Sequence, residues 1–261
     1  EHLYMRYEGK LTMIGNFSEA IAGVLGGLLA VYSLRFPFYA QALIAFSGIP
    51  AALLLKEYGG EIKRSNAFSE IIKILRYSLI TNKQLACSIL FSGIIGAATL
   101  TMAWFVQPIL MQLNTPISFY GIIWTALNLA VGIAAYYSDQ IEQRFGTTKM
   151  NVFILTSITG GYILLAFNLS SYSLLAILLC FYLVRGLATP ILKGYINQLT
   201  QSDMRATVLS IRNFIIRLMF VFIAPLAGWL SDNWGIQKAL LVIALLIFLP
   251  GILIYFASKR Q

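Results

Sequence analysis

The chain has 261 residues, of which 59% are hydrophobic and only 11% are charged, with a net charge of +9. Soluble domains carry roughly 25% charged residues, so the composition excludes an ordinary soluble protein. The histidine, His2, lies at the terminus, and Cys87 and Cys180 are isolated in apolar runs, so we expect no metal, redox or cofactor site. Because HExxH, GxSxG and paired intramembrane aspartates are also missing, the sequence predicts no enzyme.

Apolar runs separated by charges, prolines and turn residues predict eight transmembrane helices. A bilayer core needs about 20 apolar residues per helix. Lipid offers no partner to an unpaired backbone group, so each span must be helical. The sequence therefore predicts an all-α membrane protein, a polytopic helical bundle, with spans at 11–34, 36–55, 85–106, 117–138, 150–167, 172–196, 206–230 and 236–257.

A polar linker at 57–83 interrupts these spans. Within it, apolar residues recur at helical spacing, at Phe68, Ile71, Ile72, Leu75 and Leu79. This pattern predicts an amphipathic helix on the inner membrane surface. The alternative is a site for a regulatory partner.

The basic residues indicate the orientation of the chain. With the N-terminus in the cytoplasm, thirteen Lys and Arg residues fall in cytoplasmic segments and two, Arg35 and Lys238, fall outside. This asymmetry predicts a multi-pass protein of the cell membrane with both termini cytoplasmic. It also accounts for the positive net charge, and because basic patches interleaved with aromatic residues are missing, we expect no nucleic-acid partner.

The sequence repeats a pattern at an offset of about 200 residues. Arg6 begins a helix rich in small residues, and Pro50 lies in the following helix; Arg205 and Pro250 hold the equivalent places, at offsets of 199 and 200 residues. Parallel repeats of this kind build many secondary transporters. If the two halves match, we expect four more helices, about 120 residues, before this chain.

Three motifs resemble the major facilitator superfamily. Residues 22–27, Ala-Gly-Val-Leu-Gly-Gly, resemble the glycine-rich signature of its fifth helix. The stretch from Asp139 through Arg144 to Lys149 resembles its cytoplasmic Asp-to-basic loop, and residues 205–211 resemble the start of its eleventh helix. The resemblance covers the whole chain and implies helices five to twelve of the twelve-helix fold.

That resemblance implies a division of the chain and a function. Residues 1–56 would be the last two helices of the N-terminal half, 57–83 the linker, and 84–261 the complete C-terminal six-helix half. The implied function is a secondary transporter, truncated at its N-terminus, that moves a small solute by alternating access, driven by protons or another coupling ion. The alternative is a transporter-like sensor or scaffold without transport activity.

Glu19 is an acid deep within a predicted span. Its face of the helix also carries Gly23 and Gly27, whose small size allows another helix to approach closely. The resemblance implies that Asn128 faces this surface from the other half. Two readings stay open: a Glu19–Asn128 hydrogen bond that packs the halves together, and a protonatable carboxylate for ion coupling.

A polar stripe on the 172–196 span predicts a cavity-lining helix, at Tyr182, Arg185 and Thr189. A milder stripe that includes Thr99 and Gln107 suits either another cavity helix or close packing.

Arg185 and Arg217 lie about 18 and 16 Å from the cytoplasmic ends of their helices at 1.5 Å per residue. Both are then near the midplane, so we expect them to share a polar cavity. Their partner is either an anionic substrate group or an acid on helices outside this chain. We expect Lys193 and Arg212 to snorkel toward the headgroups, and Trp104 to be an interfacial anchor.

The resemblance implies that Asp139, Arg144 and Lys149 form a cytoplasmic latch. A carboxylate at a helix end can pair with basic side chains or with a neighbouring helix N-terminus. The alternative is a solvated loop that only fixes the topology.

Overall fold

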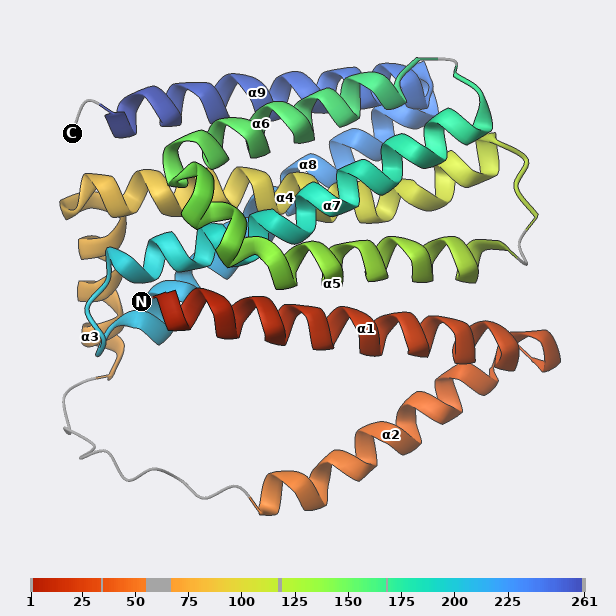
Figure 1. The fold of residues 1–261 in the computed structure, drawn as a ribbon, viewed down its shortest axis with the longest axis horizontal. Coiled ribbons are helices and arrows are strands. Elements are labelled where there is room, and N and C mark those ends of the chain that lie inside the picture. Colours follow the sequence, from red (N-terminus) through yellow and green to blue (C-terminus); the bar gives the residue numbers. More distant parts are fainter. Residues whose placement is uncertain (1, 34, 55–66, 117–118, 168, 260–261) are drawn as a thin grey trace.

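The computed structural model describes residues 2–33, 35–54, 67–116, 119–167 and 169–259 of the chain (Figure 1). The elements in these ranges are all helices. Eight of them are long: α1 His2–Tyr32, α2 Phe36–Leu53, α4 Lys83–Gln112, α5 Tyr120–Phe145, α6 Thr147–Leu165, α7 Ser171–Gln198, α8 Arg205–Trp234 and α9 Ile236–Lys259. The predicted all-α fold is therefore confirmed for the described residues.

Within the described residues, six helices are long and apolar enough to cross a membrane: α1, α4, α5, α7, α8 and α9. The prediction of membrane spans is confirmed for these six. At 18 and 19 residues, α2 and α6 are about 27 and 28 Å long, slightly shorter than a hydrocarbon core of about 30 Å. That these two helices also cross the membrane stays a prediction.

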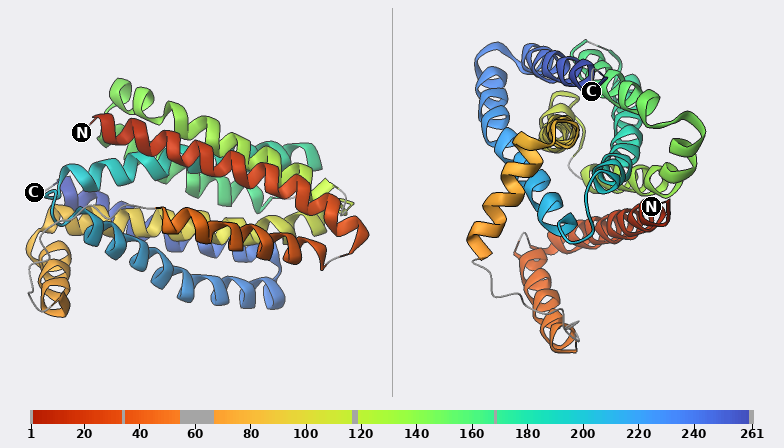
Figure 2. Two further views of the ribbon diagram at one scale, coloured as in Figure 1. Left: turned by 90° about the horizontal axis from the view of Figure 1, so that it is seen from below. Right: turned by 90° about the vertical axis from the view of Figure 1, so that its left-hand side faces the viewer.

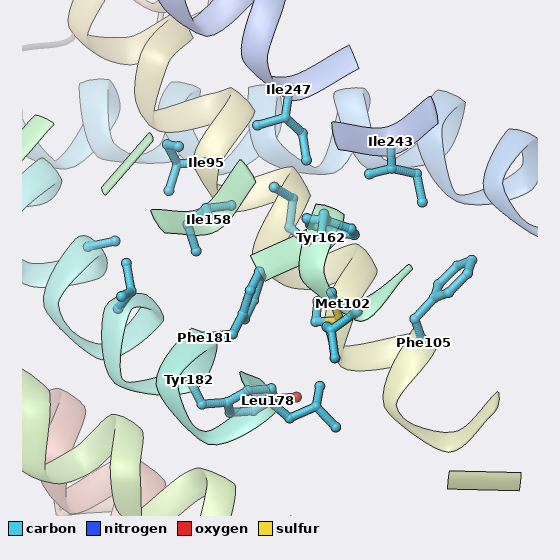
Figure 3. Close-up of a cluster of buried hydrophobic side chains, with 14 of the residues drawn as sticks. Ile95, Met102, Phe105, Ile158, Tyr162, Leu178, Phe181, Tyr182, Ile243 and Ile247 are labelled. Atoms are coloured by element: carbon cyan, nitrogen blue, oxygen red, sulfur yellow. Dashed lines mark hydrogen bonds between the residues drawn. The ribbon is translucent and has the colours of Figure 1, made fainter. Parts of the chain in front are cut away.

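Helix α4 lies at the centre of the C-terminal bundle, between α8 and α9 on one side and α6 and α7 on the other (Figure 2). Buried side chains from α4, α6, α7 and α9 interlock there, among them Ile95, Ile158, Phe181 and Ile243 (Figure 3). Tyr162 is fully buried in this core and donates its hydroxyl hydrogen to the carbonyl oxygen of Ala98, 2.7 Å away. The bundle is thus packed through its interior, and this packing holds α4 and α7 in place.

Helix α1 packs along α5 at the edge of this bundle (Figure 1). Glycines allow the two backbones to approach: a Cβ atom on Gly9 would lie 2.5 Å from the carbonyl oxygen of Ala135, and one on Gly132 would lie 2.7 Å from the ring of Phe17. Helix α2 turns back from the end of α1 and slants away from the bundle (Figure 2). Most of its side chains are exposed in the described structure.

Local signals explain several helix ends. The Asn82 side chain accepts a hydrogen bond from the Leu85 amide and so caps the start of α4. Gly146 and Gly235 have φ angles of +80° and +86°, which other residues rarely adopt, and these single glycines separate α5 from α6 and α8 from α9. Charges, which were used as boundaries, misplaced two ends: α5 continues through Asp139 to Phe145, and α1 begins at His2 rather than at residue 11.

The linker contains α3, Ala67–Arg76, followed by a π-helical turn, Tyr77–Thr81. This helix crosses the axis of the bundle beside the start of α4 (Figure 1). Its apolar residues Ile71 and Leu75 line a groove against α8, whereas Lys73 and Arg76 lie in its last turn. The remaining predicted linker residues, 57–66, lie outside the described part of the chain.

Candidate functional site

A cavity of about 540 Å³ lies between α1, α4, α5 and α7. Its lining includes Glu19 and Gly23 from α1, Gln107 from α4, and Arg185 from the middle of α7. It therefore collects polar residues from the first helix of the chain and from the C-terminal bundle. A second cavity, of about 500 Å³, lies among α4, α6, α7 and α9, but Lys149 is the one charged residue in its lining.

Glu19 and Arg185 give the first cavity one negative and one positive charge. The Arg185 guanidinium lies over the Tyr182 ring, 5.2 Å from its centroid, which holds the cation against an aromatic face. No ion pair joins Glu19 to Arg185, although both line the same space. At the centre of a helix each such charge costs about 2.5–3.5 kcal/mol to insert, so placement in a polar cavity is strongly favoured over contact with lipid.

Aromatic rings form much of the remaining wall. Trp124 and Trp104 line the cavity from α5 and α4. Trp124 packs edge-on against Tyr182 at a centroid distance of 6.4 Å, while Trp104 is 68% exposed. Trp104 thus contributes to the cavity wall, and its expected role as an interfacial anchor stays a prediction. Tyr182 itself is fully buried behind this wall and positions both Trp124 and Arg185.

The α1–α5 contact beside the cavity differs in detail from the one expected. A Cβ atom on Gly23 would lie 3.4 Å from the Trp124 ring, so Gly23 does sit at this contact. Gly27 is exposed and has no described atom within 4 Å, because α5 begins at Tyr120, level with Gly23; its expected packing role stays a prediction. The Asn128 side chain is buried but donates to the carbonyl oxygen of Trp124 within its own helix, not to Glu19.

The structure separates residues that were expected to share the cavity. Arg185 and Gln107 line it, but Arg217 is exposed on α8 and does not. Thr99 is buried and donates to the carbonyl oxygen of Gly96, and Thr189 is partly buried outside the lining. The two arginines were grouped by their depth along the helices, but depth does not determine the direction in which a side chain points around the helix axis.

Nearer the N-terminus of α1, an ion pair joins α1 to α7. Lys193 Nζ lies 2.5 Å from Glu8 Oε1, and Tyr4 donates a hydrogen bond to the other carboxylate oxygen at 3.2 Å. Arg212, only 4% exposed, donates from Nε to Ser92 Oγ at 2.6 Å. The expectation that Lys193 and Arg212 snorkel is therefore wrong, because both find polar partners inside the bundle.

The expected latch residues are not paired with one another. Asp139 is buried in the last turns of α5 and accepts a hydrogen bond from the Gln143 side chain. Arg144 and Lys149 are exposed, and neither forms an ion pair with Asp139. Within the described residues these side chains form no ion pair with one another, and the cytoplasmic latch stays a prediction.

Sequence reasoning missed Glu8, Tyr120 and Trp124. Glu8 was overlooked because the predicted span began after it, although helical periodicity continues from Glu8 toward Glu19. Tyr120 and Trp124 recur at a spacing of four at the start of α5, a signal that both residues lie on one face.

Comparison with known proteins agrees with this architecture. The sequence profile of the Major Facilitator Superfamily matches residues 4–223. The chain is also 22% identical over 264 residues to the uncharacterized MFS-type transporter YfmI of Bacillus subtilis (strain 168). That alignment covers 95% of this chain, and the chain spans 63% of the length of the relative. The multi-pass helical chain therefore belongs to the Major Facilitator Superfamily.

Proposed function

We propose that this chain is part of a secondary transporter that moves a small solute across the cell membrane by alternating access. The observation that carries the proposal is a cavity that holds Glu19 and Arg185, with the Glu8–Lys193 ion pair joining the same two helices nearer the N-terminus of α1. A transporter of this kind needs a central site that is reached from one side at a time. In the described conformation, α1 and α7 are closed on the side of the ion pair.

The orientation follows from the basic residues in the loops. We propose that both termini are cytoplasmic, because this arrangement puts thirteen basic residues inside and two outside. The ion pair then closes the cytoplasmic side, and the cavity lies nearer the outside. On the same assignment α2 and α6 also cross the membrane, with a tilt smaller than that of the longer helices.

We assign the helices by their resemblance to the twelve-helix fold. On this proposal α1 and α2 are the fifth and sixth helices, and α4 to α9 are the seventh to twelfth. Two features support it: the offset of about 200 residues between the α1–α2 and α8–α9 patterns, and the share of YfmI that the chain spans. Four further helices would then cover the exposed faces of α2 and α8.

Within the cavity, Arg185 would bind an anionic group of the solute. Its guanidinium is held by the Tyr182 ring and presents donors to the space that Gln107 also lines. An anion there compensates a charge that would otherwise be costly to keep inside the membrane. Arg185 is the substrate-binding residue of this proposal, and Tyr182 is a positioning residue.

Uptake into proteoliposomes tests the transport proposal. The full-length protein and protein-free vesicles are exposed to one mixture of metabolites, and accumulated solutes are identified by mass spectrometry. We expect at least one anionic or amphoteric solute to accumulate, and Arg185→Gln to lower its rate at least tenfold. Lys238→Gln is the control, because that lysine is exposed at the start of α9 and lies outside the cavity lining. Accumulation of no solute would instead support the sensor or scaffold alternative.

A further inference from the structure

We infer that the cavity between α1, α4, α5 and α7 binds a zwitterionic solute about the size of an amino acid. This inference rests on the proposed transport function and names the substrate class of that same site. It joins two observations: opposite charges stand in one cavity, and the two side chains do not neutralise each other.

The charge balance of the cavity favours a ligand with both signs. Among its described lining residues, Glu19 is the one acid and Arg185 the one base. A purely anionic ligand pairs with Arg185 but leaves the Glu19 carboxylate without a partner; a purely cationic ligand pairs with Glu19 and leaves Arg185 without one. An unpaired charge within a membrane span is costly. A zwitterion compensates both charges and leaves the site neutral.

Helices α1 and α7 also carry an ion pair that has a structural role in this protein. Glu8 and Lys193, also on α1 and α7, are in direct contact. Glu19 lies eleven residues after Glu8, about three helical turns, so the two acids lie on nearly the same face of α1. The Glu8 pair is closed and the Glu19–Arg185 pair is separated by the cavity. A molecule with two charged ends can therefore bind in the space between Glu19 and Arg185 and replace a direct contact between them.

The cavity walls suit an ammonium group and a compact body. Trp104, Tyr120 and Trp124 line the space that also contains Glu19. Aromatic faces attract an ammonium group and offer flat apolar surface to a side chain. A volume of about 540 Å³ lies within the range of about 300–1,000 Å³ that is usual for small-molecule sites. An amino-acid-sized solute fits this space together with several water molecules.

Matched probes distinguish zwitterionic, cationic and anionic ligands of the site. Each set contains an amino acid, the amine without its carboxylate and the acid without its amine: tryptophan, tryptamine and 3-indolepropionate; phenylalanine, phenethylamine and 3-phenylpropionate; leucine, isoamylamine and 4-methylpentanoate. Binding to the detergent-solubilised full-length protein is measured by isothermal titration and by the shift in melting temperature. We expect at least one amino acid to bind at least tenfold more tightly than both of its analogues. If no amino acid does so, the inference is overturned.

Two variants assign the charges to the two ends of the ligand. Glu19→Gln should remove the advantage of the bound amino acid over its acid analogue, and Arg185→Gln should remove its advantage over the amine. Lys238→Gln, at the exposed start of α9, is the control and should leave all three affinities unchanged. If Glu19→Gln weakens the amino acid and the acid analogue equally, Glu19 only supports the fold and the inference fails. A change in the pH dependence of transport without any change in preference would assign Glu19 to proton coupling, which also overturns it.

Parallel uptake measurements distinguish this inference from the proposed function. Accumulation of a singly charged solute, with no preference for a zwitterion, retains the transporter and overturns the zwitterion site. Preferential binding of a zwitterion without accumulation of any solute retains the site and overturns the transporter. Preferential binding together with accumulation of the same solute supports both.

Discussion

Lys193 Nζ lies 2.5 Å from Glu8 Oε1, and this contact joins α7 to α1 beneath the cavity. Both side chains are largely shielded, with 25% and 13% of their surfaces exposed. About three helical turns further along α1, Glu19 lines the cavity together with Arg185 from α7. We expect the ion pair to close the end of the cavity nearer the N-terminus of α1.

Breaking this pair should open that end. Glu8→Gln or Lys193→Gln leaves a partly buried charge without its partner, at a cost of about 1.5–3 kcal/mol, and the closed arrangement becomes less populated. We expect a cysteine introduced at Thr189, one turn from Lys193 on the same face of α7, to react several-fold faster with a membrane-impermeant maleimide added from the cytoplasmic side. The exchanged pair, Glu8→Lys with Lys193→Glu, should restore the slow rate. Lys10→Gln is the control, since that ammonium lies over the Tyr7 ring instead. Equal rates in all variants would contradict a closing role.

Gly9 should tolerate no side chain. A Cβ atom there would lie 2.5 Å from the backbone carbonyl oxygen of Ala135, and neither backbone can give way without moving a helix. We expect Gly9→Ala to lower the free energy of unfolding by about 1–3 kcal/mol. Gly15→Ala on the same helix has no described atom within 4 Å and should be neutral or stabilising by up to about 1 kcal/mol. Thermal unfolding in detergent compares the two, and equal melting temperatures would show that the α1–α5 contact is looser than described.

The hydrogen bond from Arg212 to Ser92 should contribute to stability. Ser92→Ala removes the acceptor and leaves a buried guanidinium hydrogen without a partner, which costs about 1–3 kcal/mol. Ser210→Ala is the control, because that exposed hydroxyl bonds only to its own helix at Ala206. The measurement is the melting temperature of each purified variant. A control that loses as much stability as Ser92→Ala would point to a general effect of removing serine hydroxyls.

The orientation can be checked by labelling in intact cells. In a background in which Cys87 and Cys180 are replaced by serine, single cysteines are placed at Asn114, after α4, and at Thr148, at the start of α6. We expect the cysteine at Asn114 to react with an impermeant maleimide from outside and the one at Thr148 to react only after permeabilisation. The reverse pattern would invert the proposed topology.

The sequence predicted the helices well because their main signal is local. A run of about 20 apolar residues is visible without knowing its neighbours, and the six long spans confirm that signal. Their ends were less certain: Asp139 was read as part of a loop, but at the end of α5 it is buried and accepts a hydrogen bond from Gln143. A charged residue therefore does not by itself end a helix.

The site was predicted only in part, because it depends on how each helix is rotated. The polar stripe on α7 correctly indicated that Arg185 faces a cavity. The same depth argument grouped Arg217 with it, but rise along the axis says nothing of the direction around it, and α8 points that side chain elsewhere. Lys193 and Arg212 found partners 185 and 120 residues away, and sequence spacing does not reveal such pairs.

The Arg212–Ser92 bond also has a consequence for how the chain is made. Ser92 is synthesised 120 residues before Arg212, so α4 is already in the membrane when α8 leaves the ribosome. Inserting an arginine within an isolated helix into the membrane costs about 2.5–3.5 kcal/mol. The hydroxyl of Ser92 is already in the membrane and offsets part of that cost by accepting a hydrogen bond from Arg212. Glycines at 93 and 96 leave room on the same face of α4 for Ile215, Ile216 and Met219. The early helix thus acts as an assembly template for the late one, and replacing Ser92 should lower the efficiency with which α8 is integrated during translation.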